Sequence, residues 1–288
     1  MFEQLGLIGC GLMGGSFALA LKKAGLVKRV VGYSKSPSTT EKARLMGVID
    51  VEAPSALLAV SGADIVLVAV PVAATENTFK AIRHLVNIKT LLMDVGSTKR
   101  DVVDAARRTL GSQLGTFVPT HPIAGKEQAG VEFADAELYR GRQVILTPIE
   151  RTLTAQLKQA EAVWQAVGCQ VRMMSPDAHD ATFAAVSHLP HLLAFAYMNG
   201  LASQHQVADF LSLAGPGFRD FTRIAASDPK VWRDIFSANA DELLTQTRAF
   251  REALQAFEQA ISQGNPDDVT RLIAQASLAR ANWQPGNA

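Results

Sequence analysis

The sequence lacks the features that mark secreted, membrane-spanning or nucleic-acid-binding proteins. Its 288 residues include two cysteines, Cys10 and Cys169, which are far apart and form no disulfide framework. The chain does not open with a charged segment followed by a long apolar one, and no apolar run approaches the ~18 residues of a membrane span. A formal net charge of +1 provides no broad basic field for nucleic acid or anionic lipid. We therefore expect a cytoplasmic protein that binds neither nucleic acid nor membrane.

The glycines, by contrast, form a recognisable pattern near the start of the chain. A short apolar segment runs into Gly9-x-Gly11-x-x-Gly14, and a helix-forming segment rich in alanine and leucine follows. In such a turn the first glycine permits the tight change of direction, the second lets the backbone approach a pyrophosphate, and the third lets helix and strand pack closely. The helix N-terminus offers free N–H groups to the phosphates. This stretch, with Leu12 and Met13 inside it, predicts a dinucleotide site; the alternative is a glycine-rich turn that serves packing alone.

The chain is long enough for about two domains. Up to residue 175, apolar segments alternate with helical ones, which is typical of an α/β fold with a doubly wound, mainly parallel sheet. After Ser175 only helices are expected, and their long apolar stretches look too exposed for one small bundle, which favours a dimer. We therefore predict a dinucleotide-binding domain over residues 1–175 and an all-α substrate-binding and dimerisation domain over residues 176–288.

The boundaries of the expected elements follow from the same patterns. The first strand precedes Gly9, and the others cover residues 29–33, 63–71, 90–97, 116–121, 142–147 and 170–174. The expected helices after the glycine turn cover residues 41–46, 75–85, 99–110, 152–167, 177–200 with a kink at Pro190, 207–213, 218–227, 230–263 and 266–282.

Informative residues stand where the expected strands end, at the edge where open parallel sheets bind ligands. Val70 and Pro71 end one strand and are expected to border the dinucleotide. Ser97 ends another, and it could donate a hydrogen bond to a substrate or cap the next helix. His121 ends a third strand, where the partner of a nicotinamide ring would lie. A neutral imidazole there can take a hydroxyl proton while hydride leaves the same carbon; the alternative is a histidine satisfied within a loop.

The helical part carries two imidazoles on one helix face. Ser187-His188-Leu-Pro-His191 places them at positions i and i+3. Metal binding is one interpretation, but no Glu or Cys ligand accompanies the pair at the usual spacing, so we expect no metal. Polar contacts to an anionic substrate fit the pair better. The remaining histidines, His84, His179 and His205, are interpreted as structural.

A pair of arginines follows a Gly-Pro-Gly break in the same part of the chain. Arg219 and Arg223 are at i and i+4, and an arginine beside a helix start is suited to binding a carboxylate through two hydrogen bonds. The alternative is a surface charge pair. Trp232, taken alone, is more typical of a core than of a binding site.

Together these motifs resemble the prephenate/arogenate dehydrogenase family of tyrosine biosynthesis, from Gly9 to about Ile261. The most specific segments are Asp94-Val-Gly-Ser97-Thr-Lys99, residues 121–130, Ser187 to His191, and Phe218-Arg-Asp-Phe-Thr-Arg223. The resemblance implies a Rossmann domain followed by a helical domain that forms a homodimer. It also implies NAD(P)-dependent oxidative decarboxylation of prephenate to 4-hydroxyphenylpyruvate, of arogenate to tyrosine, or of both.

The resemblance also implies roles for individual residues. His121 matches the catalytic histidine that hydrogen-bonds the ring hydroxyl, and Ser97 matches a serine that assists there. Arg223 matches the arginine that binds a substrate carboxylate. Further substrate-binding positions are Ser187, His188, His191, Lys126, Glu127 and Trp232. Because Lys126 stands where some members have threonine, the choice between prephenate and arogenate stays open.

The turn after the second expected strand bears on the choice of nucleotide. An NAD site carries an acidic residue about 20 residues beyond the glycines, where it binds the ribose 2′-hydroxyl. That count reaches Ser34, and residues 29–40 contain no Asp or Glu. Ser34, Lys35 and Ser36 instead offer donors and a positive charge to a 2′-phosphate. We expect a preference for NADP with NAD possible; the alternative is that Lys35 is a solvated surface residue and the site accepts both.

Two other functions remain open from the residues alone. One is a different two-domain dehydrogenase, of the 3-hydroxyacid or 6-phosphogluconate type. Such enzymes usually place a catalytic lysine in the helical domain, where this chain has His188, His191 and Arg223. The other is a non-catalytic protein that senses a dinucleotide with the same fold.

Overall fold

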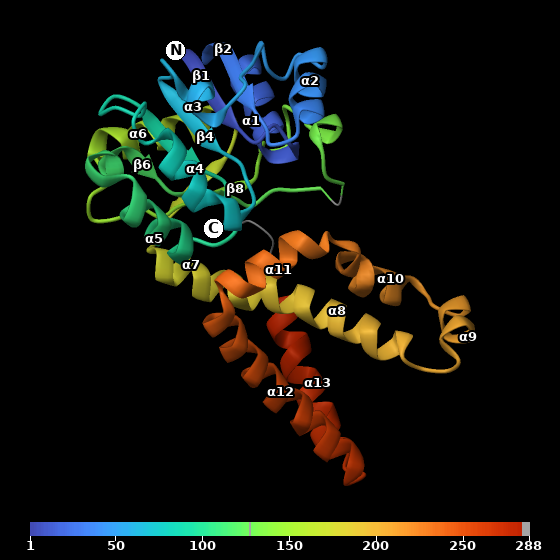
Figure 1. Cartoon of the computed structure of the whole chain (residues 1–288). Coiled ribbons are helices and arrows are strands. Elements are labelled where there is room, and N and C mark those ends of the chain that lie inside the picture. The colour runs from blue at the N-terminus through green and yellow to red at the C-terminus, as the bar shows by residue number, and fades with distance from the viewer. Residues whose placement is uncertain (127, 284–288) are drawn as a thin grey trace.

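The computed structural model describes residues 1–126 and 128–283, and within them the first part of the chain forms a parallel sheet (Figure 1). Its strands lie in the order β3-β2-β1-β4-β5-β6, and each neighbouring pair is parallel. The order reverses between β1 and β4, which creates a crevice at the carboxyl ends of these strands. The strands are β1 (Phe2–Ile8), β2 (Val27–Tyr33), β3 (Val51–Glu52), β4 (Ile65–Val68), β5 (Leu91–Asp94) and β6 (Phe117–Val118).

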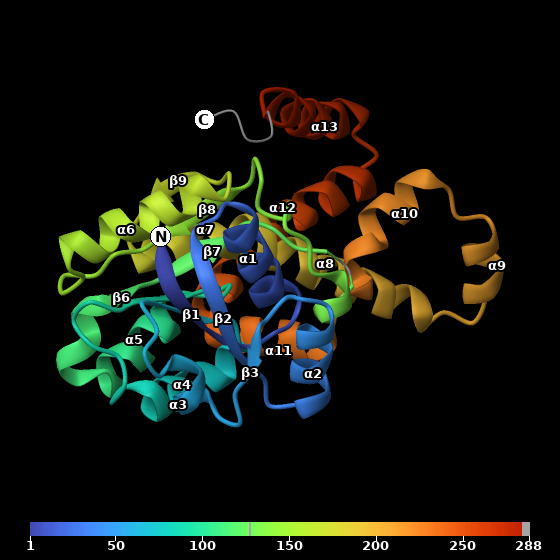
Figure 2. The same ribbon diagram turned by 90° about the horizontal axis from the view of Figure 1, so that it is seen from above.

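Helices cover both faces of this sheet because its central strands are apolar on both sides. Along β4, Ile65 and Leu67 join one core cluster while Val66 and Val68 join another, as the alternation of side chains along a strand requires. The first cluster includes Phe17 of α1 and Trp164 of α6, and Figure 2 shows these helices on the opposite side of the sheet from α3, α4 and α5. These helices are α1 (Leu12–Lys23), α2 (Pro37–Leu45), α3 (Ala56–Val60), α4 (Thr75–Ile82), α5 (Arg100–Thr109) and α6 (Thr154–Ala166). The doubly wound α/β fold is thus confirmed, although β3 and α3 were not predicted.

A second, small sheet follows the first. It contains β7 (Thr120–Pro122), β8 (Gln143–Leu146) and β9 (Gln170–Met173), with β7 antiparallel to β8. The prediction of one strand over residues 116–121 was therefore wrong, because the chain changes sheets at Pro119. Proline has no N–H to continue the first ladder, and the next N–H, of Thr120, donates to the Asp94 carboxylate instead. The switch places His121 on β7, facing the helices that follow.

Within the described residues, the chain after β9 is helical, as predicted. Its elements are α7 (Pro176–Phe183), a π-helical turn (Ala184–His188), α8 (Leu189–Ala202), α9 (Val207–Ser212), α10 (Pro216–Thr222), a 3₁₀ turn (Arg223–Ala226), α11 (Pro229–Ala238), α12 (Ala240–Ser262) and α13 (Pro266–Ala281). Figure 1 shows α12 and α13 together as one arm that points away from the sheet, with α9 and α10 at the end of another. None of the helices in the described part is long and apolar enough to cross a membrane.

The two longest predicted helices are interrupted in the structure. The expected kink at Pro190 is replaced by the π-helical turn just before it. Pro190 has no N–H to donate to a backbone carbonyl of the preceding turn. The wider π-helical turn at Ala184–His188 accommodates this missing hydrogen bond. The single helix expected over residues 230–263 was wrong, because Asn239 interrupts it with φ −117° and ψ 36°. The side chain of Asn239 is buried and takes part in the contacts described below.

Candidate active site

The glycine turn lies at the sheet crevice and has the shape of a phosphate site. Gly9 has φ +95°, and a Cβ on it would overlap the carbonyl of Ala69 after β4. A Cβ on Gly14 would overlap the carbonyl of Gly9, so both positions require glycine. A Cβ on Gly11 would meet nothing within 4 Å, which means that its backbone faces open space. Helix α1 begins there with no acidic residue in its first turn, so the turn fits the pyrophosphate of a bound dinucleotide.

The turn after β2 lies beside the glycines. Ser34 Oγ accepts a hydrogen bond of 2.8 Å from the Cys10 N–H, which ties this turn to the glycine loop. Lys35 and Ser36 are exposed, and α2 begins directly after them without a side-chain cap from Ser36. The nearest acid on the neighbouring strand, Glu52, forms an ion pair of 2.5 Å with Arg44. Polar donors therefore stand where an NAD site usually carries an acid.

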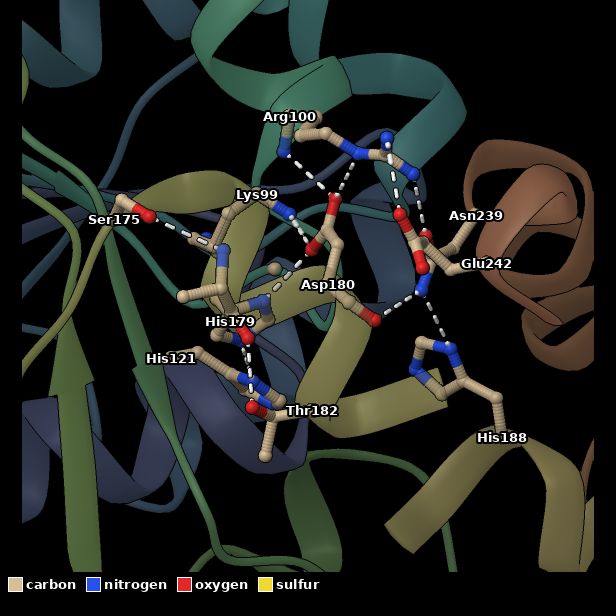
Figure 3. Close-up of polar contacts among 12 residues, drawn as sticks. Lys99, Arg100, His121, Ser175, His179, Asp180, Thr182, His188, Asn239 and Glu242 are labelled. Carbon is tan, nitrogen blue, oxygen red and sulfur yellow. Dashed lines mark hydrogen bonds and ion pairs between the residues drawn. The ribbon is translucent and has the colours of Figure 1, made fainter. Parts of the chain in front are cut away.

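His121 belongs to a chain of three hydrogen-bonded residues that crosses from β7 to α7 (Figure 3). Its Nδ1 is 2.8 Å from Nε2 of His179, and Nδ1 of His179 is 2.7 Å from Oδ1 of Asp180. A carboxylate only accepts, so His179 donates through Nδ1 and its Nε2 accepts. His121 must then donate through Nδ1. This leaves a lone pair on Nε2 of His121, which can accept a proton from a substrate hydroxyl.

The surroundings of His121 keep its ring neutral. Burial lowers the pKa of His121 well below its usual range, and the neighbouring His179 and Lys99 lower it further. Lys99 is fully buried, with Nζ 2.5 Å from Oδ2 of Asp94 and 2.9 Å from the carbonyl oxygen of Thr120. This ion pair holds the end of β5 against the start of β7. It therefore fixes the backbone that carries His121.

The two other histidines of the helical part have separate partners. His188 is buried, and its Nδ1 lies 3.2 Å from Nδ2 of Asn239. Burial lowers the pKa of His188 to about 4. His191 donates through Nδ1 to the Ser187 carbonyl at 2.9 Å, and its ring stacks on Trp232 with centroids 3.6 Å apart. Within the described residues, no group of three or more possible metal ligands gathers.

A cavity of about 450 Å³ opens between the loop after β7 and the helical part. Lys126 lies on one side of it, where its Nζ is 3.0 Å from Oδ2 of Asp135. Arg223 and His191 lie on the other side. The cavity thus combines cationic groups with an imidazole, which suits an anionic ligand. Its lining residues are Gly125, Lys126, Gln128, His191, Arg223, Ile224 and Ser227.

The structure separates the two arginines that the sequence paired. Arg219 is exposed and lies beside Asp220 at 3.5 Å, whereas Arg223 lines the cavity.

The alternative role of Ser97 as a helix cap was wrong, because Lys99 holds the N-cap position of α5. Glu127 lies outside the described residues. Val70 and Pro71 lie just after β4, which ends at Val68, and the backbone of Val70 lies beside Gly9.

Three residues at this site, His179, Asp180 and Asn239, were not predicted from the sequence. His179 was interpreted as structural, but it lies between His121 and Asp180. Asn239 was placed inside a helix. The sequence did contain an indication for His179 and Asp180. They are adjacent polar residues in the first helix after the last strand, and ionisable side chains that point inward from such a helix are unusual.

Comparison with known proteins agrees with this architecture. Residues 17–173 match the family model of the prephenate dehydrogenase nucleotide-binding domain, and residues 175–275 match that of the prephenate dehydrogenase dimerization domain. The crystal structure of prephenate dehydrogenase from A. aeolicus, in complex with hydroxyphenyl propionate and NAD+, superposes with a TM-score of 0.90 at 36% identity and covers 98% of each chain.

Two curated relatives extend the comparison. Prephenate dehydrogenase of Bacillus subtilis is 33% identical over 278 residues, which are 96% of this chain and 75% of the relative. Cyclohexadienyl dehydrogenase of Zymomonas mobilis is 31% identical over 283 residues, which are 97% of this chain and 96% of the relative. The protein is thus an NAD(P)-dependent oxidoreductase, and its C-terminal part is of a dimerisation type. The chain belongs to the prephenate dehydrogenase family.

Proposed function

We propose that the protein catalyses the oxidative decarboxylation of prephenate, of arogenate, or of both, as the last redox step toward tyrosine. The observation that carries this proposal is the orientation of His121, whose Nδ1 is engaged by His179 while Nε2 keeps its lone pair. The names of the relatives, prephenate and cyclohexadienyl dehydrogenase, support the substrate class. When bound at the glycine turn, the nucleotide supplies a hydride acceptor.

The residues of the chain then have the following roles. Nε2 of His121 takes the proton of the ring hydroxyl as the C–O bond gains double-bond character, and Ser97 hydrogen-bonds the same oxygen. As hydride leaves the carbon, the bond to the ring carboxylate breaks and its electrons complete the aromatic ring, releasing carbon dioxide. His121 then returns its proton to the phenol oxygen. Arg223 binds a substrate carboxylate; the remaining substrate contacts are assigned to Lys126, Glu127, Ser187, His188, His191 and Trp232.

Spectrophotometric assays with prephenate and with arogenate test this proposal. We expect reduced nucleotide to form with at least one of them. A protein that binds the nucleotide but oxidises neither compound would support the sensor alternative. Oxidation of a 3-hydroxyacid in place of both would support the other dehydrogenase type.

We also propose a division of the chain into residues 1–175 and 176–288, which the ranges of the two family models support. The first unit binds the nucleotide, and the second supplies Arg223, His188 and His191. A cytoplasmic location is proposed as well. It is supported by Cys10 and Cys169, which are both free and buried thiols, as expected in a reducing compartment.

For the nucleotide, we propose a preference for NADP over NAD. Ser34, Lys35 and Ser36 provide hydroxyl donors and a positive charge for a 2′-phosphate at the carboxyl end of β2. Ser34→Asp is expected to reverse the preference, because a carboxylate repels the phosphate and accepts from the ribose hydroxyls. Asp can still accept from the Cys10 N–H, so the turn should keep its shape.

The measurement is the ratio of kcat/KM with NADP to that with NAD. Ser112→Asp is the matched control, since Ser112 is exposed and precedes β6, at the opposite edge of the sheet. It should leave the ratio unchanged. A clear preference of the wild type for NAD would show that the assignment of this turn is wrong.

We further propose a homodimer that forms through residues 176–288. Two arms of helices project from the molecule (Figure 1). They carry large exposed apolar side chains, among them Leu213, which is 86% exposed. Large apolar side chains that are exposed together on projecting helices are typical of an interface. Light scattering at micromolar concentration should give the dimer mass, and Leu213→Arg should shift the equilibrium toward monomer. Leu45→Arg, at an exposed leucine of α2, should not. A monomer mass for the wild type would refute the proposal.

A further inference from the structure

Asn239 occupies the break between α11 and α12 and contacts three other parts of the site (Figure 3). Its Oδ1 accepts a hydrogen bond of 3.0 Å from Nη2 of Arg100. Its Nδ2 donates to the backbone carbonyl of Asp180 at 2.8 Å. Arginine only donates and a carbonyl only accepts, so both contacts fix the same orientation of the amide. The side chain is fully buried.

This orientation determines the tautomer of His188. The second N–H of the Asn239 amide points at Nδ1 of His188, 3.2 Å away. A donor facing Nδ1 requires a lone pair there, so the proton of a neutral His188 must sit on Nε2. Figure 3 shows Nδ1 turned to Asn239 and the other ring nitrogen turned away from it. No residue of the described chain is hydrogen-bonded to that Nε2, which leaves an N–H donor for a ligand.

Asp180 thereby sets opposite tautomers in two imidazoles. Its carboxylate accepts a hydrogen bond from His179, which in turn accepts one from Nδ1 of His121, so Nε2 of His121 is left as an acceptor. Its backbone carbonyl orients Asn239 and leaves His188 with a donor Nε2. The carboxylate itself is held by the backbone N–H groups of Lys99 and Arg100, at 2.8 and 2.9 Å. One residue thus fixes a proton acceptor on His121 and a neutral donor on His188.

We propose that Asn239 is a positioning residue that holds His188 as a neutral Nε2–H donor to an oxygen of the substrate. This inference rests on the proposed function, because it takes the acceptor to be a carboxylate or carbonyl oxygen of the cyclohexadienyl substrate. Arg100 belongs to α5 and therefore anchors the amide from the nucleotide-binding side. Its guanidinium also lies 3.4 Å from the Asp180 carboxylate and 3.6 Å from that of Glu242. The donor therefore depends on contacts from both parts of the chain.

The direct test is the ¹⁵N spectrum of histidine-labelled wild-type protein near neutral pH. The signals of His188 are identified by their loss in His188→Gln. We expect Nδ1 of His188 to resonate as a ring nitrogen without a proton and Nε2 as one with a proton. In Asn239→Asp, a carboxylate faces Nδ1 and should draw a proton onto it. A protonated Nδ1 of His188 in the wild type would overturn the proposal, whatever the behaviour of Asn239→Asp.

Kinetics supply the second readout. Asn239→Asp should raise KM for the substrate about ten-fold, in line with the loss of a hydrogen bond to a charged group. The dissociation constant of the nucleotide should not change. Asn199→Asp, the same substitution on an exposed position of α8, should leave the spectrum and KM unaltered. An Asn239→Asp variant with protonated Nδ1 and unchanged KM would overturn the role in substrate binding. If neither cyclohexadienyl compound is oxidised by the wild type, the proposed function fails while the tautomer result stands.

Discussion

His121→Asn is expected to lower kcat at least ~10²-fold, the usual low end for loss of acid–base catalysis. The asparagine amide can keep a hydrogen bond to His179, but it has no ring nitrogen to take the hydroxyl proton. Binding of the nucleotide should persist, because the glycine turn lies on other elements. Turnover is measured under saturating substrate and nucleotide, with His205→Asn as control. His205 is exposed in the helical part, and its replacement should leave kcat unchanged.

The pH dependence of the wild type gives a second check on His121. A base must be neutral to act, so activity is lost as pH falls through its pKa. Because burial, with smaller effects of His179 and Lys99, lowers this pKa well below 6.5, kcat/KM should stay level through the neutral range and decline only at clearly acidic pH. Near-normal turnover of His121→Asn, with the acid decline retained, would remove His121 from its role as the base.

Arg223→Ala is expected to raise KM for the substrate ten-fold or more. A charged hydrogen bond contributes about 1.5–3 kcal/mol, and the guanidinium lines the cavity opposite Lys126. The dissociation constant of the nucleotide should change little, because the glycine turn does not border this cavity.

Arg233→Ala is the matched control for Arg223→Ala. Arg233 lies on the neighbouring helix α11, and its exposed side chain pairs with Asp234 at 2.6 Å. Its loss should leave KM unaltered. If Arg223→Ala bound the substrate as tightly as the wild type does, the carboxylate contact would belong to Arg219 or to another residue.

Much of the fold could be predicted because its signals are local. The apolar run at residues 63–71 and the glycines before α1 describe single elements and their immediate contacts. Predictions failed where a distant partner decides the local structure. The chain leaves the first sheet at Pro119 because Asp94, 26 residues away from Thr120, binds the next N–H. The helix breaks at Asn239 where its side chain bonds Asp180, 59 residues earlier.

The candidate site divides in the same way. His121, Arg223 and the glycine turn stand in motifs whose residue types already indicate their chemistry. The protonation pattern of the histidines cannot be derived from such motifs, because it depends on which atoms meet. His179 is 58 residues from His121, and nothing in its own segment identifies that partner. The tautomers follow only once the hydrogen bonds that Asp180 accepts are known.

Oxidative decarboxylation is tested most directly by measuring carbon dioxide and reduced nucleotide in the same reaction, with prephenate and with arogenate. We expect equal molar amounts of both products from at least one substrate. Their rate of formation should be far lower in His121→Asn than in the wild type. Reduced nucleotide without carbon dioxide would indicate a different oxidation. Failure of the wild type to form either product above the uncatalysed background, with both substrates and both nucleotides, would contradict the proposed function.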